Sequence, residues 1–140
     1  MDEIKASTSL RMRRLAIALV IILCGASLRL GGYEIGLPYF LVKYGGSTLW
    51  GAMVFFLFAT LLHRQSIGRL AVLSLVSAAL VEFSRLYHAP WLDDFRLTLA
   101  GVLLLGRIFS WWNILAYAVG IALAALFEAR RLTRSDRPSD

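Results

Sequence analysis

The stretch LAVLSLVSAALVEFSRLYHAP, residues 70–90, decides the fold. Its first twelve residues are mostly apolar, and the polar residues that follow lead to Pro90, which we expect to end the helix. At about 1.5 Å per residue, twelve residues do not cross a hydrocarbon core of about 30 Å. The stretch is therefore predicted to be a membrane-spanning helix that carries Glu82 and Arg85 within the outer half of the membrane or at its edge.

The composition of the whole chain agrees with a membrane protein. Of its 140 residues, 59% are hydrophobic and the mean hydropathy is +0.68, whereas soluble domains are about 45–50% apolar. Three further apolar runs are predicted to span the membrane, at 15–28, 47–62 and 111–131. The short loop 63–69 makes the second and third spans antiparallel neighbours. We therefore predict an all-α polytopic integral membrane protein with four transmembrane helices.

A short additional helix is expected before the last span. The mostly apolar run 97–127 is too long for one ordinary span, and Gly106, Arg107 and Ser110 interrupt it. Ser110 suits the N-cap of a helix that begins at the next residue. Residues 97–106 are therefore predicted to form a short helix on the outer side, either re-entrant or interfacial.

Positive charges set the expected orientation. They precede the first apolar run, flank the central loop and end the chain, as the positive-inside rule requires for cytoplasmic termini in a bacterial inner membrane. We expect a cytoplasmic N-terminal segment 1–14, a membrane domain 15–131 and a disordered cytoplasmic tail 132–140. Because these charges orient the spans, the net charge of +6 does not indicate a nucleic-acid partner. The orienting residues are Lys5, Arg11, Arg13, Arg14, Arg64, Arg69, Arg130, Arg131, Arg134 and Arg137.

Several kinds of chemistry lack a sequence signal. The single cysteine, Cys24, excludes an intramolecular disulfide. We expect no metal site, because His88 has no second histidine on its side of the membrane and His63 is predicted on the opposite side. No nucleotide-binding loop or catalytic triad is visible, and no cofactor is expected. A cleavable signal peptide over the first apolar run is a competing interpretation, which the poor cleavage pattern and the later spans disfavour.

Glu82 and Arg85 are the strongest functional candidates. Three residues apart on a helix, they share a face and can pair. Burying an ionisable residue inside a membrane span costs free energy, so a functional role is the default interpretation. The alternative is a structural salt bridge that holds the third and fourth spans together. Asn113 and Tyr117 share a face of the last span, chiefly as part of a packing seam, and Asn113 is a candidate to join the pair.

A second polar group follows the third span. His88, with the two carboxylates of Asp93 and Asp94, could transfer a proton. Alternatively, Asp93 and Asp94 form a solvated turn that caps a helix beginning near Arg96. The candidate catalytic residues of the chain are Glu82 and Asp93.

Three arginines on the outer side indicate a possible anion site. Arg85, Arg96 and Arg107 could form a cationic pocket for a phosphate or pyrophosphate headgroup. Snorkelling anchors explain the same residues as well. The candidate lipid- or partner-binding residues are Arg85, Arg96, Arg107, Tyr87, His88, Trp91 and Asn113.

Three segments carry a family resemblance: KYGGSTLWGAMVFF (43–56), VEFSRLYHAPWLDDFRLT (81–98) and LGRIFSWWNILAYAVGI (105–121). With them the chain resembles the uncharacterised bacterial membrane proteins of domain of unknown function 2809, which are themselves similar to the VanZ-like proteins. The resemblance implies a small four-helix membrane fold of unknown activity. VanZ-like proteins are associated with tolerance to glycopeptide antibiotics, which implies by analogy a role in the cell envelope.

The chain also departs from the family pattern at three positions. Ser47 stands where the pattern has an acidic residue, Arg85 where it resembles glutamine, and Asn113 where it looks like aspartate. An activity that depends on those carboxylates therefore does not carry over directly. The matching positions are Glu82, Trp91, Asp93 and Arg96.

Three functional hypotheses follow from these observations. The first is an accessory or binding protein, without enzymatic activity, whose outer face engages a lipid headgroup or a partner membrane protein, in a larger complex or as a homo-oligomer. The second is a membrane enzyme that acts on a lipid-linked cell-envelope precursor, with Glu82 or Asp93 as acid or base. The third is a small transporter, which would need an oligomer because four spans give little room for alternating access.

Overall fold

The computed structural model describes residues 2–135, which form six helices. Four of these helices, α1, α2, α3 and α6, are long and apolar enough to cross a membrane. The predicted all-α fold with four transmembrane helices is thereby confirmed. The helices are α1 (Asp2–Gly31), α2 (Tyr39–Leu61), α3 (Ile67–Ser84), α4 (Pro90–Leu97), α5 (Leu99–Leu104) and α6 (Trp111–Ser135).

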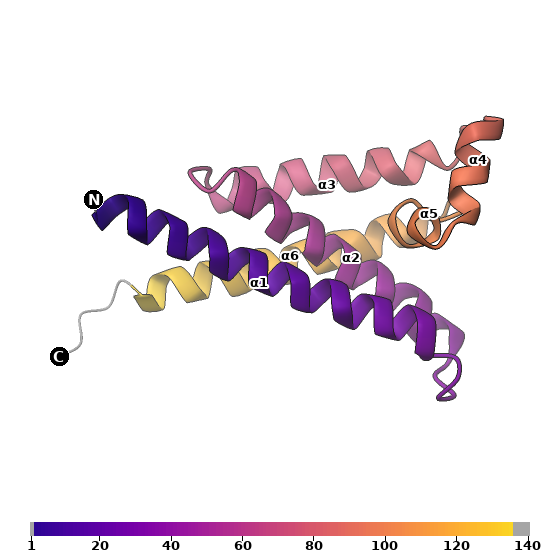
Figure 1. Cartoon of the computed structure of the whole chain (residues 1–140), viewed down its shortest axis with the longest axis horizontal. Helices are drawn as coiled ribbons and strands as arrows, with labels where there is room; N and C mark the ends of the chain where they lie inside the picture. The colour runs from indigo at the N-terminus through magenta and orange to yellow at the C-terminus, as the bar shows by residue number, and fades with distance from the viewer. Residues whose placement is uncertain (1, 136–140) are drawn as a thin grey trace.

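Helix α2 lies at the centre of the bundle, in contact with α1, α3 and α6, and α3 also packs on α6 (Figure 1). The shorter α4 and α5 contact each other at one end of the bundle, beside the last turns of α1 and α3. We call this end the α4–α5 end. The N-terminus of α1, the loop between α2 and α3 and the last turns of α6 lie at the opposite end, which we call the terminal end.

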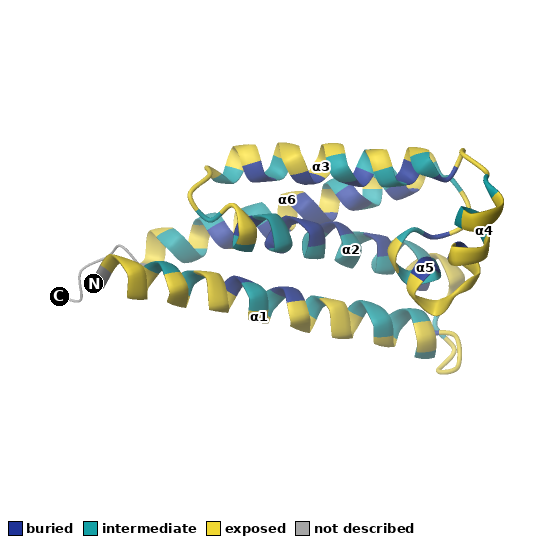
Figure 2. Ribbon diagram, turned by 45° about the horizontal axis from the view of Figure 1, so that its top comes forward, coloured by how far each residue is buried: buried dark blue, intermediate teal, exposed yellow. Residues whose placement is uncertain are grey.

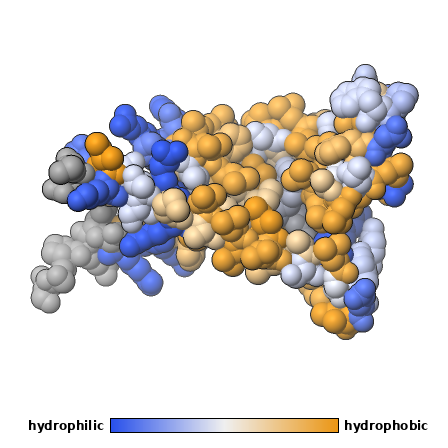
Figure 3. Space-filling view, in the orientation of Figure 1, coloured by the Kyte–Doolittle hydropathy of each residue, from blue (hydrophilic) through white to orange (hydrophobic). Residues whose placement is uncertain are grey.

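The surface of the bundle has the hydrophobicity of a membrane protein. Figure 3 shows a hydrophobic band across the middle of the visible face, with hydrophilic residues gathered toward both ends. Helices α1 and α3 contribute many exposed apolar side chains to this band, among them Leu19, Leu23, Val72 and Leu80. Such a surface is costly in water and is stable in lipid.

The core lies among the four long helices, and within it α2 and α6 approach each other closely (Figure 2). Gly51 and Gly120 permit this approach. A Cβ atom on Gly51 would lie 2.6 Å from the backbone oxygen of Tyr117, and a Cβ atom on Gly120 would overlap the backbone of Thr48. The buried core residues are Ala18, Phe55, Phe56, Ala59, Leu70, Ala78, Tyr117, Ile121 and Ala124.

Several helix boundaries differ from the predicted ones. Helix α3 ends at Ser84, and Pro90 does not end it but begins α4, where a proline fits the first turn because the N–H it lacks has no partner there. The predicted solvated turn at Asp93 and Asp94 is wrong, because both residues lie inside α4. The predicted short helix before the last span is present as α5, and the side chain of Thr98 caps it.

Helices α1, α2 and α6 are longer than the apolar runs that predicted them. Helix α1 begins at Asp2, and α2 begins at Tyr39. Helix α6 continues to Ser135, past the start of the predicted tail, and residues 136–140 lie outside the described part of the chain.

Candidate functional site

Glu82 is completely buried near the end of α3, and both of its carboxylate oxygens accept hydrogen bonds. Oε1 accepts from the backbone N–H of Ser110 at 2.8 Å and from Asn113 Nδ2 at 3.0 Å. Oε2 accepts from the Tyr117 hydroxyl at 2.8 Å. The Arg85 guanidinium adds a hydrogen bond of 2.8 Å to Oε1 and an ion pair of 2.6 Å to Oε2. These partners offset the cost of burying the charge.

Arg85 connects this carboxylate to the segment that follows α5. Its guanidinium donates to the backbone oxygens of Leu105 and Ile108 and to the Tyr117 hydroxyl, the last at 3.0 Å. Gly106 makes the approach possible: its φ of +69° is in the left-handed region, and a Cβ atom there would lie 2.6 Å from Arg85 Nη2. The segment after α5 is thereby folded over the arginine side chain.

The network reaches α2 through Ser47. The Ser47 hydroxyl donates to Asn113 Oδ1 at 3.4 Å, and both residues are buried. Ser47, Arg85 and Asn113, the three positions where the resemblance leads us to expect departures from the family pattern, therefore lie in one hydrogen-bonded network around Glu82.

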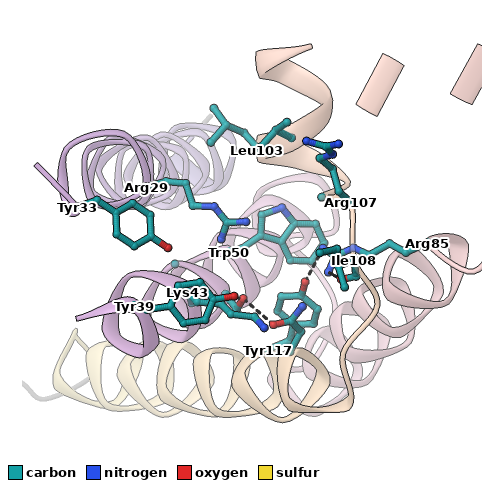
Figure 4. Close-up of a pocket in the computed structure, with 15 residues that line it drawn as sticks. Arg29, Tyr33, Tyr39, Lys43, Trp50, Arg85, Leu103, Arg107, Ile108 and Tyr117 are labelled. Atoms are coloured by element: carbon teal, nitrogen blue, oxygen red, sulfur yellow. Dashed lines mark hydrogen bonds between the residues drawn. The ribbon is translucent and has the colours of Figure 1, made fainter. Parts of the chain in front are cut away.

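A cavity of about 490 Å³ adjoins the network, between α1, α2, α6 and the segment after α5 (Figure 4). Ligand-binding cavities commonly have volumes of about 300–1,000 Å³. Neither an Asp nor a Glu lines this cavity among the residues described. Its basic lining residues are Arg29, Lys43, Arg85 and Arg107.

Three of these basic residues have no counter-charge. Arg85 is paired with Glu82, but Arg29, Lys43 and Arg107 form no salt bridge within residues 2–135. Figure 4 shows the Arg29 side chain directed into the space beside Trp50, with Arg107 on the opposite side. The cavity therefore carries an excess of positive charge, the complement of an anion.

Aromatic side chains form much of the remaining wall. The rings of Tyr33 and Tyr39 stack with their centroids 6.4 Å apart, and the Lys43 ammonium lies 5.5 Å from the Tyr39 centroid. The distance fits a cation–π interaction, which helps to hold the lysine beside the cavity. The indole Nε1 of Trp50 is buried and has no hydrogen-bond partner in the described structure. Trp50 packs on Tyr117, at a centroid distance of 5.0 Å.

The predicted pocket of three arginines is formed only in part. Arg85 and Arg107 line the cavity, as does Asn113, but Arg96 does not. The Arg96 side chain is buried and donates to the backbone oxygens of Ser84, the last residue of α3, and of Tyr87 beyond it. It also donates to Asp93 Oδ1, at 2.9 Å. Arg96 therefore fastens α4 to the C-terminal end of α3.

The other predicted residues lie on the exposed surface around α4. Tyr87, His88 and Trp91 are exposed and lie outside the cavity lining. His88 Nδ1 is 3.3 Å from both carboxylate oxygens of Asp93. Over residues 2–135, the structure contains no group of three or more His, Cys, Asp or Glu side chains that could hold a metal ion.

Sequence reasoning missed Arg29 and Lys43 as members of this site, although a signal was present. Ten of the fifteen basic residues fit the positive-inside pattern, which leaves five that do not serve orientation. All five lie toward the α4–α5 end in the structure. They are Arg29, Lys43, Arg85, Arg96 and Arg107.

A second buried ion-pair network lies toward the terminal end. Glu128 on α6 is completely buried and pairs with Arg14 of α1 and with Arg131. Arg14 also donates to the backbone oxygen of Ala59 at 2.8 Å, so its side chain joins three helices. From the sequence, Arg14 is predicted only to orient the first span, and its buried ion pair is not predicted.

The fold and the site together define a small polytopic membrane protein with a buried carboxylate network beneath a cationic cavity. The chain belongs to the family described as protein of unknown function (DUF2809), whose model matches residues 36–121. This range includes Lys43, Glu82 and Arg107 but not Arg29. No solved structure matches the chain. The likeness to VanZ-like proteins stays a prediction.

Proposed function

We propose that this protein is a non-enzymatic binding protein that holds the phosphate of an anionic lipid headgroup in the cationic cavity. The observation that carries the proposal is the convergence of Arg29, Lys43 and Arg107 on one cavity without a carboxylate partner in the described chain. Arginine binds phosphate through paired N–H donors, and lysine binds it as a point charge. A bound phosphate would supply the missing counter-charge.

The position of the cavity favours a lipid headgroup over other anions. The cavity lies toward the α4–α5 end, where the last turn of α1, the first turns of α2 and the segment after α5 line it. Tyr33 and Tyr39 line it, and tyrosines are enriched at the depth of lipid headgroups. In keeping with the positive-inside rule, we propose that this end faces outward from a bacterial inner membrane. We therefore propose an accessory role at that face, in the cell envelope.

An enzymatic role has less support. Glu82 does not line the cavity, and its two oxygens already accept hydrogen bonds from buried donors, so it has little freedom to accept a substrate proton. Asp93, the other candidate acid or base, is paired with Arg96 on α4, outside the cavity lining.

Binding to a phosphate-bearing lipid tests the proposal. The purified protein in nanodiscs of neutral lipid is titrated with phosphatidic acid, and diacylglycerol serves as the lipid without a phosphate. We expect Arg107→Gln to weaken phosphatidic acid binding about tenfold or more, the effect of one lost charge-assisted hydrogen bond. Arg64→Gln is the matched control, because Arg64 is exposed in the loop between α2 and α3. Equal affinities of the two variants would overturn the proposal.

A further inference from the structure

A second, apolar cavity of about 260 Å³ adjoins the cationic one. It lies between α1, α2 and α5, and its lining contains no charged side chain among the residues described. The two cavities share the lining residues Gly46, Trp50 and Leu103. We call the second cavity the apolar groove. Because these residues belong to both linings, the groove and the cationic cavity are immediate neighbours.

Short helix α5 forms one wall of the groove. It packs mainly on α4, and its residues Ala100, Leu103 and Leu104 face α1 and α2 across the groove. The opposite wall includes Gly25 and Ala26 of α1. Gly25 lacks a side chain and Ala26 has only a methyl group, so the space stays open. A Cβ atom on Gly25 would meet only the Leu49 side chain, at 3.7 Å.

The groove extends away from the phosphate-binding charges toward the middle of the bundle. On α1, Arg29 lines the cationic cavity, and Ile22, seven residues earlier, lines the groove. At about 1.5 Å per residue, the two positions are about 10 Å apart along the helix axis. On α2, the lining likewise passes from Lys43 in the cavity to Met53 in the groove. The two adjoining spaces therefore offer charge at one end and an apolar wall at the other, the arrangement of an amphiphile.

We infer that the apolar groove holds an acyl chain of the same lipid whose phosphate occupies the cationic cavity. The inference rests on the proposed function and adds to it that the ligand must carry a hydrocarbon chain. A soluble phosphate ester would bind through the charges alone. A lipid would fill both spaces, and van der Waals contacts between its chain and the groove walls would add to its affinity.

The first experiment compares ligands that share one phosphate headgroup. Binding of long-chain lysophosphatidic acid and of glycerol 3-phosphate to the full-length protein in neutral-lipid nanodiscs is measured by native mass spectrometry. We expect the long-chain ligand to bind at least tenfold more tightly than glycerol 3-phosphate. The corresponding monoacylglycerol measures the contribution of the chain without the phosphate. Equal affinities of lysophosphatidic acid and glycerol 3-phosphate would show that the site takes a soluble phosphate and would overturn the inference.

The second experiment fills the groove. Ala100→Trp places a large side chain in the groove from an exposed position on α5, and Ala26→Phe does so from α1. We expect both variants to lose the preference for the long chain and to retain wild-type binding of glycerol 3-phosphate. Ala122→Trp is the matched control, because Ala122 is exposed on α6 and lines neither cavity.

The variants separate failure of the inference from failure of the proposed function. If both groove variants keep the chain preference while Arg107→Gln still weakens binding, the groove is not the acyl site and the headgroup site stands. If Arg107→Gln also has no effect, the proposed function fails, and the inference fails with it. Loss of chain preference in the two groove variants, but not in Ala122→Trp, supports the inference.

Discussion

Arg14 and Glu128, which are 114 residues apart in the sequence, form a buried ion pair of 2.6 Å between α1 and α6. Removing one partner of such a pair leaves an uncompensated buried charge. We expect Glu128→Gln to lower the free energy of unfolding by about 3–5 kcal/mol, measured by denaturation in detergent. The control is Arg130→Gln, which changes an exposed charge on the same helix and should alter stability by less than about 0.5 kcal/mol. Similar stabilities would show that the pair contributes little.

The Glu82–Arg85 pair permits a double-mutant cycle. Glu82→Gln leaves the buried guanidinium without its counter-charge, and Arg85→Gln does the same to the buried carboxylate. Each single variant should therefore lose about 3–5 kcal/mol of stability. The double variant buries two neutral amides and should lose less than the sum of the two single losses. Unfolding in detergent measures all three. Simple additivity would mean that the two residues act independently.

The left-handed turn at Gly106 should be more sensitive than the one at Gly36. Both glycines have positive φ, +69° and +80°, so alanine costs about 1–2 kcal/mol of backbone strain at either position. A Cβ atom meets nothing within 4 Å at Gly36 but overlaps the Arg85 guanidinium at Gly106. We expect Gly106→Ala to be the more destabilising variant and to weaken phosphate binding as well, because Arg85 must move. Equal losses of stability would contradict the close contact.

The α2–α6 contact depends on the absence of a side chain at Gly120. A Cβ atom there would overlap the Thr48 backbone, which cannot rotate away, so Gly120→Ala should separate the helices and cost more than about 2 kcal/mol. Gly68→Ala is the contrast, because a Cβ atom at Gly68, in the first turn of α3, meets nothing within 4 Å. That variant should be neutral or slightly stabilising, by up to about 1 kcal/mol. Thermal unfolding in detergent distinguishes the two.

The membrane helices could be predicted from the sequence because long apolar runs have few alternatives to lipid burial. The pairing of Glu82 with Arg85 was also predictable, because their three-residue spacing places them on one helix face. The helix ends could not be predicted in this way, because the polar first turns of α1 give no hydropathy signal. Pro90 was misread because proline both ends helices and begins them.

The site itself could be predicted only in part, because side-chain direction depends on packing. Arg96 and Arg107 look equivalent in the sequence, yet α4 turns Arg96 back onto α3 while Arg107 lines the cavity. Arg29 and Lys43 belong to α1 and α2, far in sequence from Arg107, and only the close packing of these helices brings them to one cavity.

Arg85 belongs both to the wall of the cationic cavity and to the network that joins α3 to α6. A ligand bound in the cavity therefore contacts Arg85, the same side chain that links α3 to α6. Under the proposed function, lipid binding and folding are linked equilibria. The protein would therefore be most stable in membranes that contain its ligand. In a bilayer without that lipid, the same cluster of like charges would loosen the α4–α5 end first.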